Sequence, residues 1–169
     1  DLSLDYVIVR PAMEYGHRSD GWTTGMLKLV QRGTPVLFGG GHGHAFPVYI
    51  DNLIDGMLKT AVSPNAINQD FHFCDKTITF RQFFGYYGNM SSKTPRAMPL
   101  WGAKLLARAN QWFNLKLPIT PERIKFLTNQ ITYVTDKAET LLDYRPRISL
   151  DEGMARSEGW LKEEGYLNC

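Results

Sequence analysis

The sequence is poor in cysteine and has no long apolar run. Its 169 residues include two cysteines, Cys74 and Cys169. Two cysteines are too few for a disulfide framework or a structural zinc site, so we expect a reducing, cytoplasmic environment. Cys74 lies in an apolar stretch typical of a strand, where a reduced and buried thiol is the common case. No apolar run approaches the roughly 20 residues that span a bilayer.

A strong net charge is also lacking. The formal net charge of +2 points neither toward nor away from a polyanionic partner. The charge is uneven, however. Residues 93–125 hold seven basic residues and one acidic residue, a local net charge of +6, whereas residues 136–169 hold five basic and eight acidic residues, a local net charge of −3. Aromatic residues interleave too sparsely with the basic ones to indicate nucleic-acid binding.

What the sequence does contain is an α/β pattern. Its 43% hydrophobic and 21% charged residues are typical of a globular domain with a buried core. We expect strands at 5–10, 36–38, 45–50, 70–74 and 131–134. We expect helices at 23–32 and 99–114, and further helices that begin at Asp51, at the capping box Thr79–Gln82, at Thr120 before Pro121, at Asp136 with Glu139, and at Ser149. No repeat or linker divides the chain.

The most informative stretch is Arg10–Gly16, which follows the apolar run Tyr6–Val9. A strand that stops at a proline and leads into a Tyr-Gly pair is typical of a strand that ends in a binding loop. In open α/β sheets, ligands bind beyond the carboxyl ends of the strands. We therefore expect a binding site here.

The order of motifs resembles the C-terminal half of the extended short-chain dehydrogenase/reductases, the NAD(P)-dependent epimerase/dehydratase family. The motifs are Arg10-Pro11-x-x-x-Tyr15-Gly16, a glycine-rich loop, Pro47-Val48-Tyr49-Ile50-Asp51-Asn52-Leu53, and the tail Leu141-Leu142-Asp143-Tyr144-Arg145-Pro146 with Trp160-Leu161. The resemblance covers nearly all of the chain. It implies the C-terminal part of a Rossmann-type parallel sheet together with a mostly helical substrate-binding subdomain.

Two features that the family places before this region are missing. None of the fifteen glycines forms a dinucleotide fingerprint. Tyr133 and Lys137 have the spacing of the family's Tyr-x-x-x-Lys pair, but we expect Tyr133 in a strand, and the pair needs one helical turn. We therefore assign no catalytic residue. We expect residues 1–169, which begin with Asp1 rather than Met, to be a single C-terminal substrate-binding portion whose N-terminal, dinucleotide-binding half is absent. By itself this chain should be inactive.

The resemblance also implies binding residues. NAD or NADP would be held mainly by the missing half, with its nicotinamide end against Pro11, Ala12 and Met13. The substrate would face Tyr15, Gly16, Tyr49 and Asn52. Two of these residues have a plainer interpretation: Pro11 ends a strand, and Tyr15 packs in the core. Asp51, next to Asn52, is interpreted as a helix cap rather than a ligand-binding acid.

The expected substrate class depends on one difference between this sequence and the family's pattern. Nucleotide-sugar members of the family carry an arginine for the diphosphate where this chain has Phe46 and Pro47, and no arginine lies between Arg32 and Arg81. This departure favours the sterol-dehydrogenase-like or dihydroflavonol-reductase-like branch, with an apolar secondary alcohol or ketone as the substrate.

Three further patterns have weaker interpretations. His42 and His44 lack a third ligand, so we predict no metal site. Helix 99–114 carries Trp101, Trp112, Lys104 and Arg108, a set that can dock on a membrane surface, although core packing is the more common explanation. The unpaired edge of strand 5–10 would favour self-association, and thus a homo-oligomer.

The alternative from another class is a complete, non-catalytic module that binds a small ligand or a protein. The coding sequence upstream of Asp1 discriminates the two. A glycine-rich turn and a Tyr-x-x-x-Lys helix there would favour the enzyme, and a start codon at Asp1 would favour the module.

Overall fold

The computed structural model describes residues 4–115, 117 and 119–167. The chain folds into two compact units. The first unit consists of Asp1–Thr23, Phe46–Thr77 and Thr132–Cys169, and the second consists of Thr24–Ala45 and Ile78–Ile131. Cys169 lies outside the described residues.

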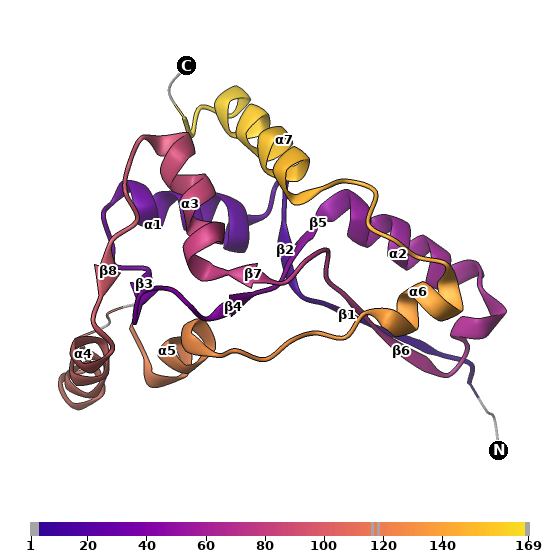
Figure 1. Cartoon of the computed structure of the whole chain (residues 1–169), viewed down its shortest axis with the longest axis horizontal. Helices are drawn as coiled ribbons and strands as arrows, with labels where there is room; N and C mark the ends of the chain where they lie inside the picture. The colour runs from indigo at the N-terminus through magenta and orange to yellow at the C-terminus, as the bar shows by residue number, and fades with distance from the viewer. Residues whose placement is uncertain (1–3, 116, 118, 168–169) are drawn as a thin grey trace. The chain divides into compact units, whose positions relative to one another are not determined.

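Parallel strand pairs form the centre of the first unit. Strand β1 (Val7–Pro11) pairs with β6 (Gln69–Phe73), and β2 (Met13–Tyr15) pairs with β5 (Pro47–Tyr49), both in parallel (Figure 1). Ala12 alone separates β1 from β2. Helix α2 (Ile50–Val62) connects β5 to β6 along the chain, and so joins one parallel pair to the other. This arrangement confirms the expected α/β class with a parallel sheet.

The remaining elements of the first unit are the 3-10 turn η2 (Pro64–Ala66) and the helices α6 (Asp136–Leu142) and α7 (Leu150–Glu163). Its core is a cluster of apolar side chains from β5, α2, η2, β6 and the segment around α6. The buried members are Val48, Leu53, Ala66, Phe71, Phe73, Ala138, Leu142 and Tyr144.

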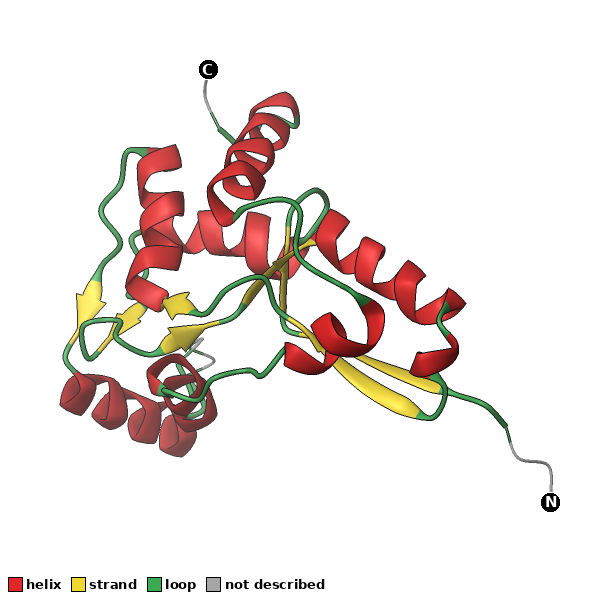
Figure 2. Ribbon diagram, turned by 45° about the vertical axis from the view of Figure 1, so that its right-hand side comes forward, coloured by secondary structure: helices red, strands yellow, loops and turns green. Residues whose placement is uncertain are grey.

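The second unit is mostly helical, as expected (Figure 2). It contains α1 (Gly25–Gln31), α3 (Phe80–Ser91), α4 (Leu100–Phe113) and α5 (Pro121–Thr128). Four short strands accompany these helices. Strand β3 (Leu37–Phe38) pairs in parallel with β8 (Ala97–Met98), and β4 (His44–Ala45) pairs antiparallel with β7 (Ile78–Thr79).

Three predicted helix starts are confirmed by side-chain caps. The Thr79 hydroxyl accepts from the Gln82 N–H at 3.2 Å, and the Gln82 side chain accepts from the Thr79 N–H at 2.9 Å, which completes the capping box. Thr120 and Ser149 likewise cap α5 and α7. The predicted burial of Cys74 is also confirmed, with 5% of the residue exposed.

Two other predicted caps are wrong. Helix α2 begins at Ile50 with Tyr49 in the cap position, so Asp51 lies in the first turn, where it pairs with Arg156 at 3.5 Å. Helix α6 begins at Asp136 itself, with no side-chain cap. Carboxylates in the first turn still stabilise a helix through its dipole. Asp51 and Asp136 therefore mark helix starts although neither is a cap.

The predicted strand 131–134 does not form. Its residues instead contact side chains that are distant in the sequence. The Ile131 carbonyl oxygen lies 2.8 Å from Nδ1 of His44, and the Tyr133 ring lies 4.6 Å from the Phe46 ring. Tyr133 is therefore not in a strand. It nevertheless precedes α6 while Lys137 lies inside it, so the two do not share a helical turn.

Other boundaries shift by a few residues. Strand β1 begins at Val7 rather than at residue 5, and the predicted helix 23–32 is a π-helical turn, η1 (Asp20–Thr24), followed by the shorter α1. The periodic residues after Asp51 do form a helix, but most of its large apolar side chains are exposed; those are Ile54, Met57, Leu58 and Val62.

Candidate functional site

A hollow of about 540 Å³ lies in the first unit at the carboxyl end of β2. Ala12, Glu14 and Tyr15 come from the strand side, and Ile50 comes from the start of α2. Residues 17–22 line the rest of the hollow. The hollow is thus where ligand sites lie in open α/β sheets, beyond the end of a parallel strand.

Gly16 makes the turn out of β2 possible. Its φ is +129°, which side chains rarely adopt, and a Cβ there would lie 2.8 Å from Cγ2 of Ile50 and 3.0 Å from Cε2 of Tyr49. The Gly16 N–H donates to the buried Thr23 hydroxyl at 2.9 Å. These contacts fix the point at which the chain leaves the strand.

The loop that follows is held by Ser19. The Ser19 hydroxyl donates to the Glu14 carbonyl oxygen at 2.8 Å and accepts from the Trp22 N–H at 3.3 Å. Loops organised by short side-chain bonds of this kind keep a defined shape. The wall of the hollow is therefore ordered by its own sequence.

Tyr15, which lines the hollow, lies beside Tyr49. Both are fully buried, and their ring centroids are 5.4 Å apart. Burial and the neighbouring Asp51 raise the pKa of Tyr49, against the lowering effect of Arg156. Tyr15 thus both packs in the core and lines the hollow, so its two interpretations are compatible.

The three predicted cofactor-binding residues lie in different surroundings. Ala12 lines the hollow, whereas Met13 is 3% exposed and Pro11 is an exposed end of β1. The N–H groups of Ala12 and Met13 already donate to the carbonyls of Phe73 and Phe46, at 3.1 and 2.9 Å. Any contact from Ala12 or Met13 to a ligand must therefore use carbonyls or side chains.

Asn52 has a structural role and does not line this hollow. It is 2% exposed, and its side-chain oxygen accepts from the N–H groups of Arg147 and Ile148 at 3.1 and 3.0 Å. Its side-chain nitrogen donates to the Ile148 carbonyl at 2.9 Å. Asn52 instead ties α2 to the segment that leads into α7, beside a separate hollow of about 310 Å³.

Among the described carboxylates, Asp75 has the pKa that departs furthest from its ordinary value. Burial raises its pKa to about 6, although hydrogen bonds from the Tyr49 N–H and the Asn52 side chain lower it. The bond from the Tyr49 N–H measures 2.7 Å. Asp75 thus anchors the end of β5 directly before α2.

Sequence reasoning missed several residues of the hollow, chiefly Glu14, His17 and Trp22. The His17 ring stands edge-on to Tyr49 and Trp160, with centroid distances of 6.4 and 6.1 Å. Their one signal was position, directly around the Tyr-Gly pair. Among the described residues, no three His, Cys, Asp or Glu side chains cluster as metal ligands would.

Comparisons with known proteins place the fold. No family model matches the sequence. The uncharacterized protein y4nL of Sinorhizobium fredii is 29% identical over 178 residues, which cover 96% of this chain and 49% of that protein. The chain thus spans about half the length of this relative.

Solved structures match over a similar share. A nucleoside-diphosphate-sugar epimerase from Pseudomonas aeruginosa matches with a TM-score of 0.71 and 18% identity, over 96% of this chain and 49% of that one. The UDP-glucose 4-epimerase of Thermotoga maritima, solved with UDP-glucose, gives 0.67 and 21%, over 95% and 47%. The UDP-glucuronic acid 4-epimerase of Bacillus cereus, solved with UDP-glucuronic acid and NAD, gives 0.64 and 22%, over 94% and 45%. At these identities the likeness establishes a shared Rossmann-like α/β fold.

Proposed function

We propose that this chain is the substrate-side portion of an NAD(P)-dependent oxidoreductase or epimerase of the extended short-chain dehydrogenase/reductase family. The observation that carries the proposal is the match itself, which takes in nearly all of this chain but only about half of each epimerase. The motif order from Arg10 to Trp160 supports the same family. The reaction would transfer hydride between the nicotinamide and a secondary alcohol or ketone.

Exposed apolar surface on the first unit supports the proposal that an N-terminal half covers it. In the described residues β1 pairs only with β6, and Ile8 on β1 is 43% exposed. On α2, Ile54 and Leu58 are 47% and 62% exposed. Unpaired strand edges and exposed apolar side chains are normally covered by further structure. The N-terminal, dinucleotide-binding half is the occupant that we propose.

The hollow at the end of β2 would then be the near wall of the active site. Ala12 would lie against the nicotinamide end of the dinucleotide, with the carbonyl of Pro11 as a polar contact, while Met13 is buried in the β2–β5 pair. Tyr15, Gly16 and Tyr49 would shape the substrate side, and Asn52 would act through the segment it holds. The missing half would supply the Tyr-x-x-x-Lys acid–base pair, while this chain binds, orients and excludes water.

We propose an apolar substrate rather than a nucleotide sugar. Phe46 occupies the place of the family's diphosphate-binding arginine, and it is 4% exposed with its ring against Tyr133. A buried phenyl ring offers no donor to a diphosphate, which needs a bidentate cation. The choice between NAD and NADP would be made by the N-terminal half that we propose.

The first test reads the coding sequence upstream of Asp1 and then uses the full natural chain. A strand, a glycine-rich turn and a Tyr-x-x-x-Lys helix are expected there. The full chain should quench or shift NADH or NADPH fluorescence on binding, whereas the 169 residues alone should not turn over ketones with either. A start codon at Asp1, or turnover by the 169 residues alone, would overturn the proposal.

A variant pair sharpens this test. Ala12→Phe would fill part of the hollow and should weaken dinucleotide binding by the full chain about tenfold or more. Ala155→Phe, at an exposed position on α7, is the matched control and should leave the affinity unchanged. Equal affinities for both variants would remove Ala12 from the cofactor site.

The complete binding module remains the second candidate, and one observation favours it. The first unit has its own well-buried core. If the module is right, the 169 residues should form a monodisperse, cooperatively melting monomer. If the enzyme half is right, they should self-associate through β1 and α2.

A further inference from the structure

Helix α4 of the second unit is packed in reverse of the usual pattern. Its buried residues are the small Ala103 and Ala107, which are 0% and 1% exposed. Its tryptophans and Leu105 face outward, with Trp101 74% exposed, Leu105 64% and Trp112 89%, whereas Leu100 and Leu106 are half-buried. A helix in a globular protein normally buries its largest apolar side chains, so core packing does not explain these tryptophans.

The outward residues form one continuous stripe. Trp101, Leu105, Arg108 and Trp112 are separated by four, three and four positions, and that spacing places side chains on one helix face. Phe113 extends the apolar surface at the C-terminal end, where it is 70% exposed. We call this face the α4 stripe.

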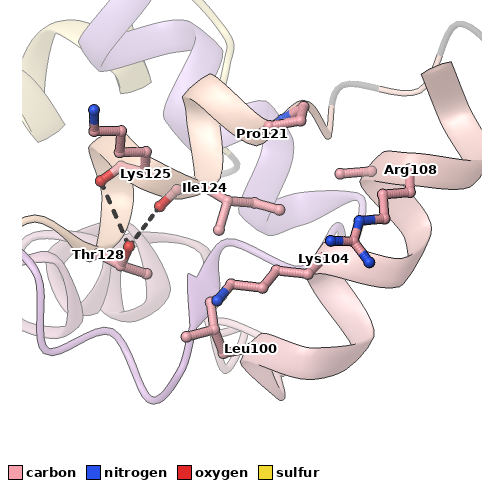
Figure 3. A pocket seen from close by; sticks show the side chains of 8 residues that line it. Leu100, Lys104, Arg108, Pro121, Ile124, Lys125 and Thr128 are labelled. Carbon is pink, nitrogen blue, oxygen red and sulfur yellow. Dashed lines mark hydrogen bonds between the residues drawn. The ribbon is translucent and has the colours of Figure 1, made fainter.

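The charged residues of helix α4 itself all have one sign. Helix α4 carries Lys104 and Arg108 and no acidic residue. These two cations line a groove of about 430 Å³ between α4 and α5, together with Lys125 and the apolar Ile124 (Figure 3). The ion pairs within the described part of the chain involve none of these three cations.

We propose that the α4 stripe docks on a membrane surface rich in anionic lipid. Exposed tryptophans at both ends of a short helix, with lysine and arginine beside them, suit the boundary between headgroups and acyl chains. The cations would face the lipid phosphates, and the apolar side chains would enter the boundary. Within the described residues no helix is long and apolar enough to cross a membrane, so the contact is peripheral.

Charge decides between this occupant and two others. A second copy docked through the same stripe would place Lys104 and Arg108 against their own equivalents, with no acid on α4 to offset them. A nucleic acid would use the cations but would leave the tryptophans and Leu105 in water. An anionic bilayer satisfies both features at once.

The test is co-sedimentation of the full natural chain with vesicles of phosphatidylcholine alone or with phosphatidylglycerol. Binding is expected to the anionic vesicles and to weaken as salt is raised. The charge reversal Lys104→Glu/Arg108→Glu should reduce binding at least 25-fold, at about fivefold for each cation lost. The matched control is Arg145→Glu/Arg147→Glu, an equal charge change on exposed arginines of the first unit, which should bind as the natural protein does.

The apolar part is tested separately by Trp101→Ala/Trp112→Ala. This variant should lose at least about tenfold in vesicle affinity, whereas Val134→Ala, at a residue that is 68% exposed in the first unit, should lose none. Far-UV circular dichroism verifies that each variant is folded. No binding to anionic vesicles, or equal binding by the α4 and control variants, would overturn the proposal. So would a drop in sedimenting mass of the tryptophan variant without vesicles, because a second copy would then be the occupant.

Discussion

Gly153 of α7 lies directly against the hydroxyl of Tyr15, with no room for a side chain between them. A Cβ on Gly153 would meet that hydroxyl and would also lie 3.0 Å from Cδ2 of Tyr49. Because both tyrosines are fully buried, neither can move aside cheaply. The last helix thus packs directly on Tyr15, which lines the hollow, and on its neighbour Tyr49.

Gly153→Ala should therefore destabilise the protein. Overpacking costs about 1–3 kcal/mol, which exceeds the gain of up to about 1 kcal/mol from replacing a helical glycine with alanine. Gly159→Ala is the control in the same helix, since nothing lies within 4 Å of a Cβ there. Urea unfolding should show the control to be stabilised; equal shifts for both variants would contradict the packing account.

Asn52→Ala should be among the more damaging substitutions in the first unit. It removes hydrogen bonds to the Arg147 and Ile148 N–H groups and to the Ile148 carbonyl, and leaves these groups unpaired. The expected loss is about 2–4 kcal/mol by urea unfolding. Asn65→Ala removes one exposed bond of 3.4 Å and should cost under about 0.5 kcal/mol. A small loss at Asn52 would mean that its role is in binding and not in structure.

Asp75 should make stability depend on pH. Its pKa is raised from 3.8 to about 6 in the folded protein, so the folded state binds the proton more tightly than the unfolded chain does. Its contribution to stability is therefore full below about pH 4, falls as the pH rises through about 6, and is constant above that.

Asp75→Asn keeps an acceptor for the Tyr49 N–H but cannot ionise. We expect the variant to be more stable at pH 7 by about 1–3 kcal/mol, with the difference from the natural protein vanishing near pH 4. Thermal or urea unfolding across this range measures it. A constant difference at every pH would show that Asp75 does not titrate in this window.

Cys74 should be chemically inert in the folded protein. Burial, and then the charge of Asp75, raises the pKa of its thiol to about 12, and the thiolate is the reactive form. With Cys169→Ser removing the other thiol, a disulfide reagent at pH 8 should label Cys74 only after urea is added. Rapid labelling of the native variant would mean that β6 opens readily.

Helix starts that neighbouring residues determine were predictable from the sequence, whereas the face that a helix buries was not. The bond between Thr79 and Gln82 is set by four consecutive residues, so its pattern identified the start of α3. Asp51 lies two positions after the cap residue of α2 and Asp136 one position after that of α6, and a carboxylate is favourable at the cap and in the first turn alike. Periodicity identified α4 as a helix but could not say that Ala103 would be buried and Trp101 exposed.

The same distinction holds for the candidate site. The stretch from Arg10 to Gly16 was recognised because a strand that ends in a loop has a characteristic pattern, and the family resemblance singled out Ala12 and Tyr15, which line the hollow. His17 and Trp22 were missed because a loop side chain has no periodicity, and its position depends on bonds such as those of Ser19. Tyr133 was wrongly predicted to lie in a strand. The segment has β-prone residues, but it is coil, and the Tyr133 ring packs on Phe46.

The interleaving of the two compact units constrains how this protein can be cut or recombined. The backbone passes from one unit to the other after Thr23, Ala45, Thr77 and Ile131. Truncation after Ile131 would strip Leu142 and Tyr144 from the cluster that also holds Phe71 and Phe73. A chimera that borrows either unit from a relative must therefore splice at every one of these junctions together, and a single crossover would leave both halves with unfinished interiors.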